Sequence, residues 1–174
     1  MRRVVVVGAP GSGKSTVGTR LAKALDAELI ELDSLWWDKG WQAVGKESLR
    51  DRLTPLLARD RWVVEGAYVD QVSDLVWPVA DIVLWLDLPR RVSVSRAVLR
   101  SLARAVHRQE LYNGNRESLA VLAPGAIGGL VRRSPAYGER IEGRLKELGL
   151  YDSRVERLRS QREVDMWCRA FRDC

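Results

Sequence analysis

Hydrophobic residues along this 174-residue chain alternate between two spacings. Residues 4–7 form a continuous run of valines, which is typical of a strand covered on both faces. Residues 14–25 place apolar side chains three and four positions apart, which predicts an amphipathic helix. Further apolar runs predict strands over residues 28–32, 61–65, 81–86 and 153–158. We therefore expect strands and helices to alternate along the chain.

Helical spacing predicts further elements between and after these strands. The predicted helices cover residues 46–57, 88–106, 134–148 and 161–172. Pro55 argues against one straight helix in the first of them, because proline lacks an N–H and its ring clashes with the preceding turn. Ser134 is expected to begin the third, and Gly149 to end it in the left-handed conformation. Residues 109–133, rich in glycine and arginine, are expected to form a loop.

This alternation predicts an α/β protein with a mainly parallel sheet and helices on both of its faces. Ligands bind such sheets in the crevice at the carboxyl ends of the strands. The chain shows no internal repeat, low-complexity segment or interdomain linker. We therefore expect one domain over residues 1–174, with an insert near residues 33–60 and a lid near residues 109–133.

A glycine-rich segment joins the first strand to the first helix and matches the pattern G-x-x-x-x-G-K-[ST]. Its glycines let backbone N–H groups face inward, beside the positive end of the following helix. Lys14 is expected to reach the β- and γ-phosphates of ATP, and the Ser15 hydroxyl to bind Mg²⁺. An ordinary glycine turn is disfavoured, because both the motif and its flanking elements are present. The expected nucleotide-binding residues are Gly8, Ala9, Pro10, Gly11, Ser12, Gly13, Lys14, Ser15 and Thr16.

Acidic residues stand at the ends of three predicted strands. Glu31 and Asp33 are two positions apart, so both are expected on one face at the end of the second strand. Glu65-Gly66 ends the third strand and Asp87 the fourth. Glu31, Glu65 and Asp87 are the candidates for holding Mg²⁺ through water, while Asp33 is favoured as a catalytic residue beside the acceptor. A helix cap or a solvated loop carboxylate is the alternative for each acid.

Three tryptophans, Trp36, Trp37 and Trp41, follow Asp33 closely. Near a phosphate site, an indole ring can stack on a base or another substrate ring. It can equally pack the insert against the core, and the sequence leaves both roles open. The candidate substrate-binding residues are Asp33, Trp36, Trp37, Glu65, Gly66 and Arg96.

The net charge of +6 fits either nucleic acid or a phosphate-rich substrate. Arg96, Arg100, Arg104 and Arg108 are spaced by four and are expected along one flank of a helix. A guanidinium group can donate two parallel hydrogen bonds to phosphate oxygens. A closing lid can bring such arginines to a transferred phosphoryl group. We expect Arg100 and Arg116 to be catalytic together with Lys14. A solvated helix face or a nucleic-acid surface is the alternative, and the segment lacks the interleaved aromatics of single-strand binders.

The remaining composition excludes several classes of protein. Hydrophobic residues make up 46% and charged residues 30%, as in folded domains, and no apolar run approaches the roughly 20 residues of a membrane span. A cytoplasmic location without a membrane partner is expected. Cys168 is expected to be a buried thiol rather than half of a disulfide with Cys174. With His107 as the single histidine, a transition-metal site is disfavoured.

Other segments accompany the phosphate-binding loop, at residues 32–37, 40–41, 64–68, 86–90 and 113–117. Together they resemble the adenylate-kinase-like P-loop ATPases, among which some relatives are called DNA topology modulation proteins. The wider nucleoside-monophosphate and shikimate kinase superfamily implies a P-loop NTPase fold. That fold is a three-layer α/β/α sandwich around a five-stranded parallel sheet in strand order 2-3-1-4-5, with a short substrate insert after strand two and an arginine-rich lid after strand four.

The same resemblance implies roles for particular residues. Glu31 and Asp33 resemble the paired acids of shikimate-type kinases, and Glu65-Gly66 resembles the Asp-Gly of adenylate kinases. The counterparts of lid and post-lid arginines are Arg96, Arg100, Arg116 and Arg140. The insert is shorter than a full nucleotide-monophosphate domain and lacks the arginine with which adenylate kinases grip the AMP phosphate. AMP is therefore disfavoured as the acceptor.

The leading hypothesis is an ATP-dependent phosphotransferase, a P-loop kinase that uses Mg²⁺ and moves the γ-phosphoryl group to a nucleotide or a small hydroxylated metabolite. The alternative is a nucleotide-binding regulator that contacts DNA through the arginines, with weak or no ATPase activity. A catalytically quiet binding module is disfavoured because it would have no use for Lys14 and Ser15. The residues do not distinguish ATP from GTP or fix the oligomeric state.

Overall fold

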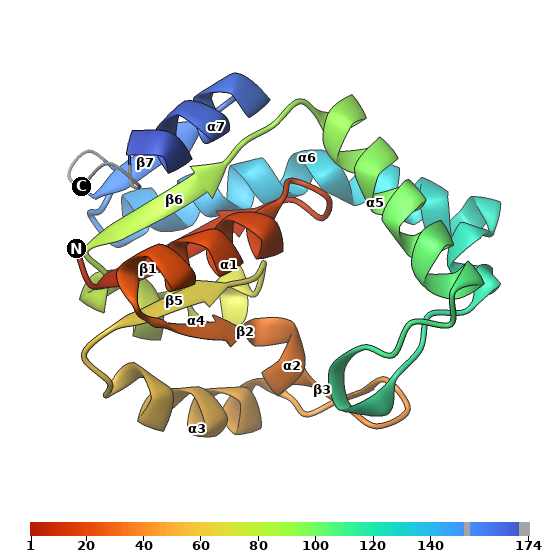
Figure 1. Ribbon diagram of the computed structural model, residues 1–174, viewed down its shortest axis with the longest axis horizontal. Helices are drawn as coiled ribbons and strands as arrows, with labels where there is room; N and C mark the ends of the chain where they lie inside the picture. Colours follow the sequence, from red (N-terminus) through yellow and green to blue (C-terminus); the bar gives the residue numbers. More distant parts are fainter. Residues whose placement is uncertain (152–153, 171–174) are drawn as a thin grey trace.

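The computed structural model describes residues 1–151 and 154–170, without the side chains of residues 121, 122, 124 and 126–135. Its centre is a five-stranded parallel sheet in the order β2-β5-β1-β6-β7 (Figure 1). The strands are β1 (Arg3–Gly8), β2 (Glu28–Glu31), β5 (Trp62–Glu65), β6 (Ile82–Leu86) and β7 (Val155–Leu158). Counted along the chain, their order is 2-3-1-4-5, so the predicted fold class and strand order are confirmed.

Helices follow most of the strands. They are α1 (Lys14–Leu25), α2 (Leu32–Trp36), α3 (Lys46–Leu57), α4 (Val69–Val76), α5 (Arg90–Val106), α6 (Pro124–Glu147) and α7 (Gln161–Ala170). Outside the sheet, β3 (Trp37–Asp38) and β4 (Gln42–Ala43) pair antiparallel as a small hairpin. Short 3₁₀ turns cover Trp77–Val79, Tyr112–Gly114 and Leu119–Leu122. No helix among the described residues is both long enough and apolar enough to cross a membrane.

The core lies on both faces of the sheet, because successive residues of a strand point to opposite sides. Val5 and Val7 of β1 belong to a buried cluster that α3, α4 and α6 complete. Val4 and Val6 belong to a second cluster, which α1 and α7 complete on the other face (Figure 1). This double burial explains the unbroken run of valines. Cys168 lies in the second cluster and is 6% exposed, as predicted, whereas Cys174 lies outside the described residues.

The structure corrects two predictions about helices and adds two short helices, α2 and α4, that the sequence did not predict. α3 continues through Pro55, which is exposed and close to the helix end, while Leu49 and Leu53 anchor the helix at 0% exposure. α4 was not predicted, because eight residues give too short a periodic pattern. α6 begins at Pro124 instead of Ser134, so the last part of the predicted loop is helical. Proline suits the first turn of a helix, but the glycines that follow it disfavour helix and pointed to a loop. Gly149 has a φ of 66° after α6, as predicted.

Candidate functional site

The phosphate-binding loop lies between β1 and α1 at the carboxyl edge of the sheet, and α5 packs directly against it. Gly11 has a φ of 80°, and a Cβ atom added there would lie 2.0 Å from the carbonyl oxygen of Ser93 in α5. Both the backbone conformation and this contact require glycine. Ser12 is 2% exposed, and its N–H donates to the carbonyl of Ala9 at 3.1 Å. The loop is therefore a compact turn held between α1 and α5.

Lys14 and Ser15 begin α1, directly after the loop. The Lys14 Nζ donates to the carbonyl oxygens of Gly8 and Ala9 at 3.0 and 3.1 Å. Burial lowers the pKa of the Lys14 ammonium, while the carboxylates of Glu65 and Asp33 oppose this shift. The Lys14 ammonium therefore lies in the field of two acids.

Glu65 stands at the end of β5 and faces α1. It is 2% exposed and accepts a hydrogen bond from the Ser15 hydroxyl, with 3.0 Å between Oγ and Oε1. Burial raises the pKa of the Glu65 carboxyl, while Lys14 and Ser15 act in the opposite direction. Among the three acids predicted for the metal shell, Glu65 is the one in contact with Ser15.

Asp33 is held by an interaction that the sequence analysis did not predict. β2 ends at Glu31, and Asp33 lies in the first turn of α2, so the two acids do not share one face of a strand as expected. They are still neighbours, because burial and the Asp33 carboxylate together raise the pKa of Glu31. The Tyr68 hydroxyl donates to Asp33 Oδ1 at 2.5 Å. Tyr68 lies three residues after Glu65 in the sequence, and this closeness to a predicted site residue could have indicated that Tyr68 lies near the site.

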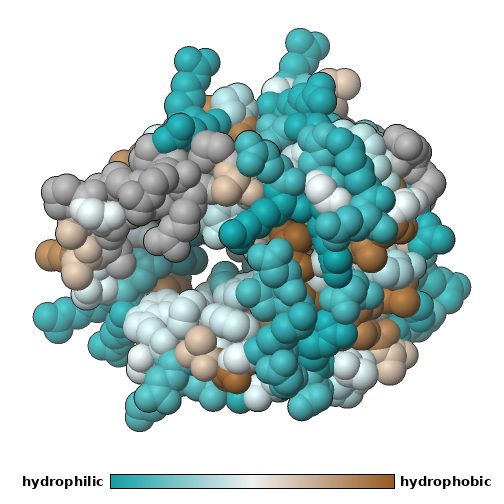
Figure 2. Space-filling view, turned by 180° about the vertical axis from the view of Figure 1, so that it is seen from behind, coloured by the Kyte–Doolittle hydropathy of each residue, from teal (hydrophilic) through white to brown (hydrophobic). Residues whose placement is uncertain are grey.

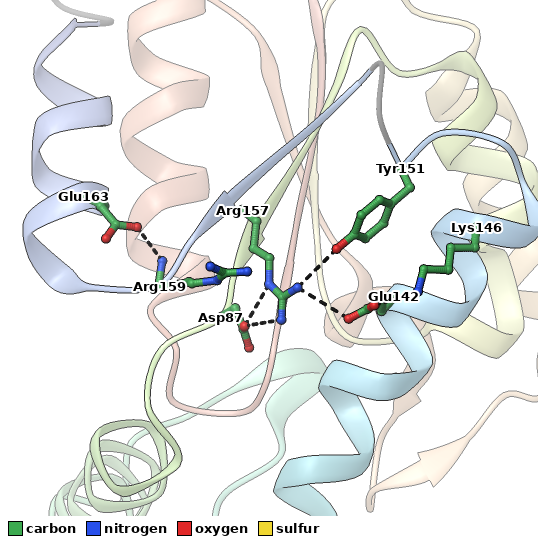
Figure 3. Close-up of polar contacts among 7 residues, drawn as sticks. All are labelled: Asp87, Glu142, Lys146, Tyr151, Arg157, Arg159 and Glu163. Carbon is green, nitrogen blue, oxygen red and sulfur yellow. Dashed lines mark hydrogen bonds and ion pairs between the residues drawn. The ribbon is translucent and has the colours of Figure 1, made fainter.

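Asp87 does not join the other acids. Its Oδ2 accepts two hydrogen bonds from Arg157, at 2.9 Å from Nε and 2.7 Å from Nη2 (Figure 3). The Arg157 guanidinium also reaches Glu142 of α6 and lies 3.9 Å from the ring centre of Trp85. Asp87 lines a separate cavity of about 160 Å³. The structure thus assigns Asp87 to the contact between β6, β7 and α6, away from Ser15.

Two cavities open on either side of the phosphate-binding loop. The first measures about 330 Å³, and Lys14, Ser15, Asp33 and Glu65 meet in it. The second measures about 390 Å³ and lies between the loop, α1, α5 and the start of α7. Arg100 of α5 lines both. The space-filling view is deeply hollowed, with pale and hydrophilic side chains beside the opening (Figure 2). The arrangement can hold two ligands that meet at the loop.

The other lining residues show which predicted residues the fold brings together. The first cavity is also lined by Trp37, Tyr68, Asp70, Arg104, Tyr112, Tyr137 and Arg140. The second is also lined by Gly11, Ser12, Gly13, Thr16, Arg96 and Gln161. Of the three predicted tryptophans, Trp37 reaches the cavity. Trp36 packs against the core and contacts Tyr68, with 5.2 Å between ring centres.

The four predicted arginines do not form one continuous cationic flank. Arg96 bonds to Gln161 at 2.9 Å, and Arg104 pairs with Glu117 at 3.3 Å. Arg100 has no hydrogen-bond or ion-pair partner in the part of the chain that the structure describes. Arg108 lies beyond the end of α5 with a φ of 47°. This arrangement gives no support to a DNA-binding face along the helix.

Arg116 is not brought to either cavity. It is exposed and lies 3.6 Å from Glu110, with which it also forms an isolated β-bridge. Its backbone carbonyl accepts a hydrogen bond from Trp41 Nε1 at 3.1 Å. Arg116 therefore contributes to the contact between two loops, and the catalytic role expected for it has no geometric support.

Two asparagines tie residues 109–117 to the hairpin of the insert. Asn113 Nδ2 donates to the carbonyl of Trp37 at 2.6 Å, and Asn115 Nδ2 donates to that of Asp38 at 2.9 Å. Asn115 Oδ1 accepts from the backbone N–H of Trp41 at 2.9 Å. We call Trp41, Asn113 and Asn115 the asparagine clasp. It connects the segments that bring Trp37 and Tyr112 to the first cavity.

A family model described as an AAA domain matches residues 4–111, which include the phosphate-binding loop, Asp33, Glu65 and α5. The chain belongs to this AAA domain family. The matched region contains most of the candidate site. Tyr137 and Arg140 of α6 lie beyond the match and complete the first cavity of this AAA-domain protein.

Curated relatives of this AAA-domain protein include shikimate kinases. That of Corynebacterium efficiens is 62% identical over 32 residues, which are 18% of this chain and 19% of that protein. That of Mycobacterium ulcerans is 37% identical over 68 residues, which are 39% of this chain and 37% of that protein. The chain thus spans well under half the length of these curated relatives in each match.

Solved structures resemble the AAA-domain protein over nearly its whole length. Shikimate kinase from Bacteroides thetaiotaomicron gives a TM-score of 0.59 at 16% identity, covering 99% of this chain and 97% of that one. Shikimate kinase from Acinetobacter baumannii, solved in complex with shikimate, gives 0.52 at 19% identity, covering 98% and 90%. At such low identity, the likeness establishes the P-loop kinase fold.

Proposed function

We propose that this protein is a P-loop kinase that moves the γ-phosphoryl group of ATP to a nucleotide or a small hydroxylated metabolite. The observation that supports this most directly is the meeting of Lys14, the Ser15–Glu65 pair and Asp33 in a cavity beside the phosphate-binding loop. The shikimate kinases among its relatives support the same class of reaction.

The second cavity is the proposed site of the ATP nucleoside. The triphosphate tail would then run along the loop, whose backbone N–H groups and the start of α1 favour negative charge. Lys14 would contact the β- and γ-phosphates, and Arg100, at the border of both cavities, would stabilise the charge that spreads over the transferred group. In this arrangement the γ-phosphate would lie at the entrance to the first cavity.

The residues beside the loop fit a magnesium ion. Hydroxyl and carboxylate oxygens are the protein ligands that Mg²⁺ takes, and Ser15 Oγ and Glu65 Oε1 lie 3.0 Å apart. No group of three or more His, Cys, Asp or Glu side chains within the described residues could hold a metal alone, so phosphate oxygens and water would complete the shell. When bound, Mg²⁺ would neutralise charge on the β- and γ-phosphates.

Asp33 is the proposed general base. For a hydroxyl acceptor, Asp33 would accept the proton through the carboxylate oxygen that Tyr68 does not hold. Walls from the insert and from α6 would keep water away from the transferred group. For a phosphate acceptor, no base is required.

The test is acceptor-dependent ADP release from Mg-ATP, measured on a panel of nucleosides, nucleotides and hydroxylated metabolites. Lys14→Ala is expected to lower kcat by at least about 100-fold, since a preorganised cation at the developing charge contributes roughly 3 kcal/mol. Lys23→Ala, an exposed lysine in the last turn of the same helix, is the matched control and should leave kcat unchanged. Full turnover by the Lys14→Ala protein would refute the proposal.

A further inference from the structure

We infer that the acceptor is an uncharged ring compound with a free hydroxyl, without a phosphate or carboxylate of its own. This inference rests on the proposed kinase activity and restricts the class of compound that accepts the phosphoryl group. In the transfer, the acceptor oxygen forms a bond to the γ-phosphorus, the bond from that phosphorus to the β–γ bridging oxygen breaks, and ADP leaves. The hydroxyl proton passes to Asp33.

The arginines on the acceptor side already have anionic partners. Arg104 Nη1 lies 3.3 Å from Glu117 Oε1, and the two side chains are only 20% and 13% exposed. Arg140 Nη1 lies 3.3 Å from Asp70 Oδ2 on the more open side of the cavity. An anionic acceptor would have to share one of these arginines with its carboxylate partner and then lie beside that carboxylate. Like charges at such distances lower affinity, which makes each carboxylate an element that rejects anions.

The remaining cations of the first cavity lie on the ATP side. Lys14 is at the loop, and Arg100 lines both cavities. The triphosphate tail would occupy both groups. Within the described residues, no unpaired cation of this cavity is then left for a second anion. Arginine is the residue that most often recognises the phosphate or carboxylate of a substrate, through paired hydrogen bonds.

The carboxylates of Asp33 and Glu65 line the part of the cavity where the acceptor hydroxyl would lie. Asp33 forms no ion pair among the described residues; its hydrogen bond comes from the neutral Tyr68 hydroxyl, and the Lys14 ammonium acts on it at longer range. Burial is the main cause that raises the pKa of Glu31 and of Glu65, and the Asp33 carboxylate adds to both shifts. Glu31 lies outside the lining of the cavity but within electrostatic reach of Asp33 and Glu65. The two lining carboxylates accept hydrogen bonds from hydroxyls and repel anions.

The shape of the cavity favours a ring. Aromatic side chains of four residues line it, namely Trp37, Tyr68, Tyr112 and Tyr137. Aromatic faces bind flat or alicyclic rings with little loss of side-chain entropy. The volume of about 330 Å³ stands at the lower end of small-molecule sites, which are roughly 300–1,000 Å³. A nucleoside, a cyclic sugar or a cyclitol has the appropriate size.

The first test compares compounds that share a ring but differ in charge. The pairs are nucleosides with their 5′-monophosphates, hexoses with hexuronic acids, and cyclitols with ring hydroxy acids. Kd is measured by calorimetry with a non-hydrolysable ATP analogue and Mg²⁺, and again without nucleotide, so that the comparison holds in either state. Where a pair binds, we expect the neutral compound to have a Kd at least about tenfold lower than that of its charged counterpart.

Tighter binding of the charged member in any pair, or no binding of any neutral member, overturns the inference. The proposed function fails separately, by lack of binding of the ATP analogue or by lack of ADP release. Binding of the analogue together with a preference for anions would contradict the acceptor class alone.

The second test changes the charge balance of the cavity. Asp70→Asn frees Arg140, so the charged member of a bound pair is expected to bind at least about tenfold more tightly than it binds the unchanged protein. Asp60→Asn is the matched control, because it breaks a surface pair with Arg2 at 2.9 Å outside both cavities. Thermal unfolding verifies that both variants fold. An Asp70→Asn protein with unchanged affinity for anions would show that paired carboxylates do not set the preference.

Discussion

At the scale of single residues, Tyr68 determines where the candidate base points. Its hydroxyl holds Asp33 Oδ1 at 2.5 Å, which leaves the other carboxylate oxygen for the acceptor. Burial raises the pKa of Tyr68, and the Asp33 carboxylate raises it further, so the phenol keeps its proton at neutral pH and remains the donor. Tyr68 is therefore a positioning residue that acts through Asp33.

Tyr68→Phe removes this donor and keeps the ring. A hydrogen bond to a charged group contributes about 1.5–3 kcal/mol, so kcat for a hydroxyl acceptor is expected to fall about 10- to 100-fold while the Kd of ATP stays the same. Steady-state kinetics and calorimetry measure the two quantities. Tyr151→Phe, which loses a hydroxyl that Arg157 contacts, is the control. Equal losses of kcat in both variants would indicate a general structural effect.

Glu65 is a carboxylate whose burial costs stability. Burial raises its pKa more than Lys14 and Ser15 lower it. A carboxyl with a raised pKa in the folded state holds its proton more tightly there than in the unfolded chain. Its contribution to stability is therefore fully present below the ordinary value of 4.5 and is lost as the pH rises through the folded pKa.

Glu65→Gln resembles the protonated acid at every pH. We expect this variant to match the unchanged protein in free energy of unfolding near pH 4 and to exceed it at pH 7, while losing Mg-ATP turnover. Urea unfolding at the two pH values measures the difference. Glu156→Gln, in an exposed position of β7, shows the effect of removing a surface charge. A Glu65→Gln protein that is less stable at pH 7 would contradict the proposed cost of burial.

At the scale of elements, the asparagine clasp makes the insert and residues 109–117 one unit. Asn115 is 4% exposed. Its Nδ2 donates to the carbonyl oxygens of Asp38 and Tyr112, and its Oδ1 accepts from the backbone N–H of Trp41. A buried amide with these partners fixes the distance between two segments that lie more than 70 positions apart in the sequence. The clasp thus holds the aromatic walls of the first cavity in place.

Asn115→Ala is expected to raise the KM of the acceptor about tenfold, because leaving its partners unpaired costs about 1–3 kcal/mol. The Kd of ATP should change little, since the second cavity does not include these segments. Hydrogen exchange should become faster in the hairpin and in residues 109–117 together. Gln42→Ala, exposed in the same hairpin, is the control. Faster exchange in one segment alone would show that the clasp does not couple them.

Local signals predicted the strands of the sheet and the position of the phosphate-binding loop. The valine run of β1 and the phosphate loop depend on neighbours in sequence, and Glu65 and Asp33 meet Lys14 because parallel strands end at one edge of the sheet. Asp87 occupies an equivalent strand end, but its environment depends on Arg157, 70 positions away. Distant contacts of this kind leave no periodic pattern in the sequence.

At the scale of the whole molecule, Gly11 lets α5, the helix that carries Arg100, pack closely on the loop beside the centre of the sheet. The phosphate-binding loop follows the central strand β1, and α5 follows β6 and crosses over the loop. Gly11 allows this approach, since a Cβ atom there would lie 2.0 Å from the Ser93 carbonyl and 2.8 Å from the Ala97 nitrogen. Both atoms belong to backbone and cannot move aside without moving α5. Arg100, one turn further along α5, depends on the same contact for its place between the cavities.

Gly11→Ala is therefore expected to change the molecule as a whole. Strain at a positive φ costs about 1–3 kcal/mol, and overpacking adds roughly as much, so the free energy of unfolding should fall by several kcal/mol. ATP binding should weaken even where the protein remains folded, because α5 and Arg100 move away from the loop. Gly40→Ala, with a φ of 77° and no atom within 4 Å of the added Cβ, is the control for a positive φ without the contact. The loss of stability in Gly11→Ala beyond that of Gly40→Ala measures the close packing of α5 on the loop, and equal losses would mean that α5 does not depend on this contact.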